Sequence, residues 1–167
     1  MTLTIPDAAA MRAFAAALAK LLQPGDLLIL TGGLGAGKTT FTQGLGAALN
    51  VRGQVSSPTF IVAREHPSLG AGPNLVHVDA YRLGGLDELD ALDLDSSLDE
   101  AVTVVEWGAG LAESLASDHL EIQIDRPQGG FTPDDDPEAG ERLVNLKPHG
   151  PRWHGVDFSA VPQATLE

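Results

Sequence analysis

The feature that most constrains the fold of this chain is a glycine-rich turn between an apolar run and a run with helical spacing. Leu27–Leu30 has the composition of a buried strand, and Thr40–Leu49 carries apolar or small residues at the spacing of a helix. The turn between them contains Gly-x-x-x-x-Gly-Lys-Thr, from Gly32 to Thr39. A strand, a glycine loop and a helix in this order are typical of a phosphate-binding P-loop. We therefore predict an α/β domain with a mainly parallel central sheet flanked by helices.

The residue types in this turn suit the binding of a nucleoside triphosphate. Glycines allow backbone conformations in which successive N–H groups point inward around phosphate oxygens. The anion then lies at the positive end of the following helix. Lys38 adds a full charge for the β and γ phosphates, and the Thr39 hydroxyl is suited to Mg²⁺. The alternative, a glycine turn with an incidental lysine, does not explain the strand before it and the helix after it.

Length and composition place the chain among ordinary globular proteins. Its 167 residues are enough for one domain with its own core, and 43% of them are hydrophobic against 20% charged. It contains no cysteine, which excludes disulfides and cysteine-ligated metal sites. The N-terminal residues lack the basic region of a signal peptide, and no apolar run reaches the length of a membrane span. We therefore expect a cytoplasmic protein without membrane contact.

The net charge of -13, from 10 basic and 23 acidic side chains, bears on possible partners. Affinity for nucleic acid comes largely from lysine and arginine side chains that neutralise phosphates. An acidic protein is therefore not expected to bind RNA tightly by itself, and a partner would hold any RNA. The alternative is that the acidity only keeps the protein soluble.

The first part of the chain is predicted to be a helix. Asp7 follows a proline and can cap a helix that runs to about Leu22, and Pro24-Gly25 then turns the chain into the apolar strand. We interpret this helix as a packing element, although its first turn could approach a bound nucleotide.

The last part of the chain is predicted to be a hairpin and a tail. Residues 120–124 and 141–147 both alternate in polarity, and we expect them to pair antiparallel. Arg142 lies on the second strand, where it could reach a nucleotide or remain an exposed cross-strand charge. Residues 1–150 then form one P-loop domain, and residues 151–167 a poorly ordered tail.

Two predicted strands end in acidic residues. The apolar runs 75–78 and 101–105 are followed by Asp79 and Glu106. The carboxyl ends of strands are where open α/β sheets bind ligands, so either acid could hold Mg²⁺ or orient the attacking water. A helix cap is the alternative for Asp79, and the spacing does not decide which acid binds the metal. We interpret His77, inside the first strand, as a buried histidine with satisfied hydrogen bonds.

Two other segments allow two interpretations each. Ser57-Pro58-Thr59 is either a turn before a strand or a switch whose threonine senses Mg²⁺ and the γ-phosphate. Leu86–Glu100 carries seven acidic residues, and it is either a solvated face or a docking surface for a basic partner.

Four motifs together resemble the bacterial TsaE (YjeE) family, a small ATPase needed to make threonylcarbamoyladenosine on tRNA. They are GGLGAGKTT at 32–40, SPTF at 57–60, HVDAYR at 77–82 and VEW at 105–107. The P-loop alone indicates only a superfamily, whereas the other three motifs in this order are specific. The resemblance covers about residues 5–150 and implies the P-loop NTPase fold.

This resemblance implies roles for individual residues. Thr39 and Glu106 would hold Mg²⁺. Lys38, the switch threonine Thr59 and Asp79 would act in hydrolysis. ATP would be bound by the P-loop and two later side chains, which are Leu34, Gly35, Ala36, Gly37, Lys38, Thr39, Thr40, Trp107 and Arg142.

The resemblance also implies the partners TsaD and TsaB. TsaD would perform the carbamoyl transfer, and this protein would reset the complex by Mg²⁺-dependent ATP hydrolysis, with tRNA involved only indirectly. One rival hypothesis is a small-molecule kinase on the same fold, which would need a lid with several arginines. Another is a nucleotide-gated binding module with negligible hydrolysis.

Overall fold

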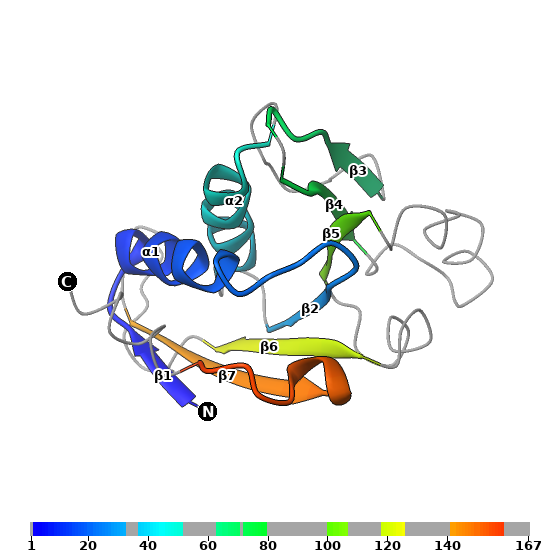
Figure 1. Cartoon of the computed structure of the whole chain (residues 1–167). Coiled ribbons are helices and arrows are strands. Elements are labelled where there is room, and N and C mark those ends of the chain that lie inside the picture. The colour runs from blue at the N-terminus through cyan, green and yellow to red at the C-terminus, as the bar shows by residue number, and fades with distance from the viewer. Residues whose placement is uncertain are drawn as a thin grey trace.

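A seven-stranded sheet connects the described parts of the computed structural model, which are residues 2–32, 37–51, 63–70, 72–79, 100–106, 118–125 and 141–158. The strand order is β1-β7-β6-β2-β5-β4-β3 (Figure 1). The strands are β1 (Thr2–Ile5), β2 (Leu27–Thr31), β3 (Ala63–His66), β4 (Asn74–Asp79), β5 (Ala101–Glu106), β6 (His119–Asp125) and β7 (Arg142–His149).

The central strands β6, β2, β5 and β4 run parallel to one another. Strand β7 pairs antiparallel with β6, and β1 with β7, while β3 pairs antiparallel with β4 at the other edge. These pairings confirm the predicted mainly parallel α/β sheet and its antiparallel late pair. The segment Ser57-Pro58-Thr59, residues 86–99 of the acidic segment and residues 159–167 of the predicted tail lie outside the described residues.

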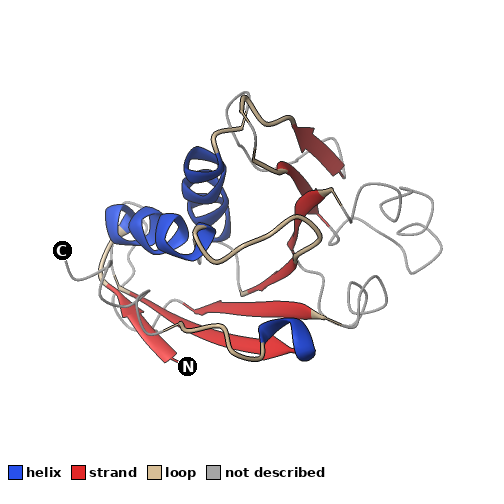
Figure 2. Ribbon diagram, viewed as in Figure 1, coloured by secondary structure: helices blue, strands red, loops and turns tan. Residues whose placement is uncertain are grey.

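Two helices, α1 (Ala8–Ala19) and α2 (Lys38–Leu49), lie on the same side of the sheet (Figures 1 and 2). Their apolar side chains form one cluster with alternate residues of the strands, such as Leu28 and Leu30 of β2. The helices meet through the rings of Phe14 and Phe41, whose centroids are 5.6 Å apart. The helix that follows the glycine loop and strand β2 thus share one apolar core with α1.

Local sequence explains where α1 begins and where it crosses α2. The Asp7 carboxylate accepts a hydrogen bond of 2.8 Å from the Ala10 amide, which confirms the predicted cap. The helix ends at Ala19 and not at Leu22. At the crossing, a Cβ on Gly44 would stand only 2.8 Å from the Arg12 Cα, so glycine allows the two backbones to approach closely. Neither helix of the described residues is long and apolar enough to cross a membrane.

Strand β1 was not predicted from the sequence. Its four residues alternate between exposed and buried, with Leu3 and Ile5 entering the core. Such a short run is a weak signal, because it becomes a strand only by pairing with β7, more than 130 residues later in the chain.

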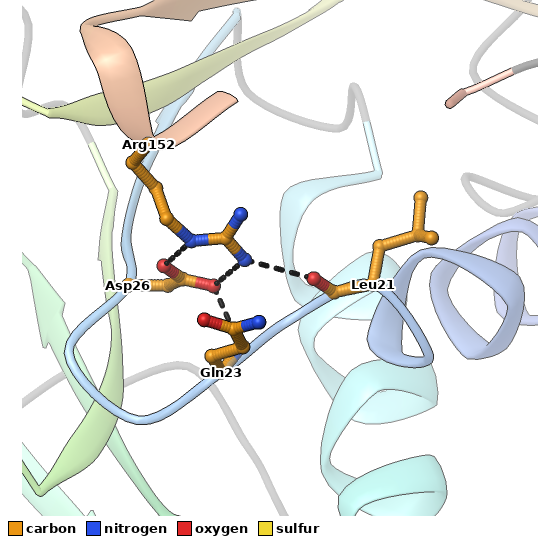
Figure 3. Close-up of polar contacts among 4 residues, drawn as sticks. All are labelled: Leu21, Gln23, Asp26 and Arg152. Atoms are coloured by element: carbon orange, nitrogen blue, oxygen red, sulfur yellow. Dashed lines mark hydrogen bonds and ion pairs between the residues drawn. The ribbon is translucent and has the colours of Figure 1, made fainter. Parts of the chain in front are cut away.

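The first residues of the predicted tail pack against the domain, so the expectation of poor order does not hold for residues 151–158. A short 3-10 helix, Pro151–Trp153, places the Trp153 side chain in the core with 4% of the residue exposed. Arg152 donates from Nε to Asp26 Oδ1 at 2.8 Å and from a terminal nitrogen to Asp26 Oδ2 at 2.9 Å (Figure 3). The same guanidinium donates to the Leu21 carbonyl, and the backbone N–H of Gln23 donates to Asp26 Oδ2. This bidentate pair attaches the segment to the turn before β2.

Replacing Arg152 with methionine should lower the free energy of unfolding by about 3 kcal/mol, because Asp26 would remain buried without its counter-charge. For a chain of this size that corresponds to a fall in melting temperature of roughly 8 °C, measurable by circular dichroism. The double variant Arg152→Met with Asp26→Asn should recover part of the loss, because it removes the uncompensated charge. Equal melting temperatures for wild type and Arg152→Met would contradict the assigned role.

Candidate functional site

The glycine loop joins the carboxyl end of β2 to the N-terminus of α2. Strand β2 ends at Thr31 and α2 begins at Lys38, so the described ends of the loop are Gly32 and Gly37. Gly37 has φ +108°, which side chains rarely adopt, and it begins the helix without a side chain that could cap it. The first amides of α2 are therefore available to an anion at this end of the helix.

Lys38 connects the two ends of the loop. Its Nζ donates a hydrogen bond of 2.9 Å to the Gly32 carbonyl, and the residue is only 7% exposed. Burial removes rotamer freedom from a long side chain, so its charge is held close to the loop. On the other side, the Lys38 carbonyl accepts from the Thr42 hydroxyl at 2.9 Å, one turn later in the helix. The lysine amine thus lies at the glycine loop.

Arg142 lies beside the last glycine of the loop. Its Nε is 4.0 Å from the point where a Cβ on Gly37 would stand, and the residue is 4% exposed. A terminal nitrogen of the guanidinium donates to the Glu141 carbonyl at 3.3 Å. The alternative of an exposed cross-strand charge is therefore wrong. Strand β7 carries a second buried cation to the loop.

Helix α1 also reaches the loop. The Met11 Cε is 3.4 Å from the same Cβ position on Gly37, and the residue is 1% exposed. A Cβ at this position would make only ordinary contacts with Met11 and Arg142, but a side chain would be strained by the positive φ. The backbone conformation thus favours glycine at the start of α2, and α1 packs beside it.

Glu106 ends the strand next to β2 on the same edge of the sheet. Leu30 of β2 and Asp79 of β4 are its partners in the register of the two neighbouring strands. Glu106 is 3% exposed, and its Oε1 has no hydrogen-bond partner among the described residues. A carboxylate with an unmet oxygen beside a phosphate-binding loop fits Mg²⁺, which prefers oxygen ligands and keeps one or two carboxylates together with phosphates and waters.

His77 lies against Glu106. Its Nε2 is 3.4 Å from Glu106 Oε2, and the histidine is fully buried. Neither ring nitrogen has a hydrogen-bond partner within the described part of the chain. The interpretation of His77 as a histidine with satisfied hydrogen bonds is therefore wrong within the described part of the chain. Its position in the motif HVDAYR was visible in the sequence, but its contact with β5 was not.

The structure describes some of the remaining predicted site residues and not others. Thr39 is half-buried in the first turn of α2, and Thr40 beside it is buried. For Asp79 only the backbone position at the end of β4 is described. Outside the described residues lie Leu34, Gly35, Ala36, Thr59 and Trp107. Among the described members, Gly37, Lys38, Thr39 and Thr40 lie at the start of α2, Arg142 lies beside Gly37, and Glu106 ends the strand next to β2.

Comparisons with known proteins agree on one family. The family model described as "Threonylcarbamoyl adenosine biosynthesis protein TsaE" matches residues 5–130. A Streptomyces coelicolor protein named tRNA threonylcarbamoyladenosine biosynthesis protein TsaE is 56% identical over 152 residues, which are 90% of this chain and 99% of that protein. A Mycobacterium bovis protein of the same name is 45% identical over 132 residues, 75% of this chain and 79% of that one.

A solved structure is similar over nearly the whole chain. The crystal structure of Bacillus subtilis YdiB matches with a TM-score of 0.67 and 28% identity, covering 99% of this chain and 93% of that one.

Proposed function

Because this chain belongs to the TsaE family, which takes part in tRNA threonylcarbamoyladenosine biosynthesis, we propose that it is the Mg²⁺-dependent ATPase of that process. In this proposal ATP binds at the loop between β2 and α2, and water attacks the γ-phosphate. The main support for the proposal is the position of three side chains. Lys38 and Arg142 lie at this loop, and Glu106 ends the strand beside β2. The two cations can offset phosphate charge, and the carboxylate can hold the metal ion of a bound triphosphate.

The protein contributes to hydrolysis mainly by position and charge. The amides at the start of α2 and Lys38 bind the phosphates, and Arg142 adds a second positive charge beside Gly37. The Thr39 hydroxyl and the Glu106 carboxylate hold Mg²⁺, which when bound neutralises charge on the β and γ phosphates. Asp79, at the end of the neighbouring strand, orients the attacking water, with Thr59 as the switch residue. Leu34, Gly35, Ala36, Thr40 and Trp107 complete the nucleotide site.

The proposed partners are TsaD and TsaB, with hydrolysis resetting their complex. The charge of the chain supports this arrangement, because a net charge of -13 opposes tight binding to tRNA. The protein would therefore act on tRNA modification through its partners, and not by holding the RNA itself. It would work in the cytoplasm.

The test is reconstitution with the full chain. Phosphate release from ATP and Mg²⁺ should be slow for the isolated protein, and TsaD with TsaB should raise it roughly tenfold or more, as partners do when they complete a P-loop site. EDTA should abolish release with and without partners. No stimulation would overturn the partner assignment. Failure of the folded protein to bind ATP or ADP in calorimetry with Mg²⁺ would overturn the ATPase proposal itself.

A further inference from the structure

The pair formed by His77 and Glu106 is not explained by packing alone. His77 lies inside β4, directly beside Val104 of β5 in the register, and Glu106 is two residues further along β5. The 3.4 Å between His77 Nε2 and Glu106 Oε2 lies just beyond the usual range of an N–H···O hydrogen bond. Such bonds in functional sites are often long without ligand and shorten when the ligand binds. The two groups thus lie within a small movement of a hydrogen bond.

The buried polar atoms of this pair lack the partners that such atoms normally have. Both His77 ring nitrogens and Glu106 Oε1 are buried without a hydrogen bond in the described part of the chain. A buried polar group without a partner costs stability, and structures retain few of them. A histidine that served only the core would be expected to bond a backbone group or be replaced by an apolar residue. The arrangement therefore points to a group that arrives with the ligand.

We propose, on the basis of the Mg²⁺-dependent ATPase function above, that His77 is a positioning residue for Glu106. In the nucleotide-bound state its Nε2–H donates to Glu106 Oε2, which leaves Oε1 for the cation of the bound nucleotide or for a water in its shell. The imidazole is fully buried between strands, so its direction is set by packing. A carboxylate held in this way binds a metal more tightly than one that must first be ordered.

The test measures how much Mg²⁺ strengthens ADP binding. ADP affinity is determined by calorimetry with the full chain, once with Mg²⁺ and once with EDTA, and the ratio is the Mg²⁺ enhancement. His77→Phe keeps a ring of similar size without the nitrogens. It should lower the enhancement about tenfold and leave the affinity in EDTA unchanged. In His77→Gln the side-chain amide nitrogen can reach the place of Nε2, so this variant should keep most of the Mg²⁺ enhancement.

Two further variants separate positioning from structure. His66→Phe alters another buried histidine, on β3 opposite Leu75 and away from the loop edge, and it should change neither affinity. In a Glu106→Gln background, His77→Phe should cause no further loss, because His77 acts through Glu106. If His77→Phe does not fold by circular dichroism, His77→Asn replaces it. Its shorter side chain stops before the place of Nε2, so it should lose the enhancement.

The outcomes separate the metal role of Glu106 from the positioning role of His77. A wild-type protein whose ADP affinity is the same in Mg²⁺ and in EDTA would overturn both the metal role of Glu106 and the role of His77. A normal wild-type enhancement that persists in folded His77→Phe would overturn only the role of His77. If His77→Phe lost the same factor of ADP affinity in Mg²⁺ and in EDTA, the role of His77 would also be overturned, because the loss would be a general structural effect.

Discussion

Replacing Lys38 with alanine is expected to lower ATP hydrolysis at least about a hundredfold, the loss typical of removing one preorganised charge from a transition state. The charge is placed at the loop by the hydrogen bond from Nζ to the Gly32 carbonyl and by burial of the side chain. Water cannot replace it, because a water molecule carries no full charge and is not held in position. Phosphate release in the reconstituted system measures the effect.

Lys147→Ala is the matched control for this prediction. Lys147 is an exposed lysine on β7, and its amine donates to the Gln123 side chain at 3.1 Å. Its removal should leave hydrolysis unchanged, because exposed pairs far from the loop contribute little. A Lys38→Ala variant that folds and hydrolyses ATP at the wild-type rate would show that phosphate is bound elsewhere.

Glu106→Gln is the second variant with a large expected effect. It keeps the shape of the side chain but removes the charge, so Mg²⁺ should lose a ligand and hydrolysis should fall roughly a hundredfold. The melting temperature should stay the same or rise, because a buried charge without a cation is costly and the neutral amide is less so. Lost activity together with retained stability would separate a metal role from a structural one.

The control for Glu106→Gln is a carboxylate on another parallel strand. Glu121 lies on β6, with its Oε2 3.8 Å from the His149 ring, and it is not at the end of its strand. Glu121→Gln should therefore leave both hydrolysis and Mg²⁺ dependence unchanged. If Glu106→Gln retained full Mg²⁺-dependent hydrolysis, Asp79 would be the better candidate for the metal.

Local sequence was enough to predict the elements that carry the loop. The apolar run of β2, the glycines and the helical spacing of α2 lie next to one another, so their structure depends on neighbours a few residues away. The Asp7 cap was predicted for the same reason, whereas the antiparallel pair of β6 and β7 was predicted from the matching alternation of polarity in two successive strands. The family also follows from sequence, because its motifs are short and occur in a fixed order.

Contacts between residues far apart in the sequence were decided only by the tertiary structure. The sequence does not state that β6 lies beside β2, and this order brings Arg142 to Gly37 and leaves it buried. Likewise Arg152 meets Asp26 across 126 positions of chain, which turned a predicted tail into a packed segment. His77 meets Glu106 because β4 and β5 pair in one register. Periodicity reports the face that a residue presents, whereas its neighbour across the sheet depends on how the whole chain packs.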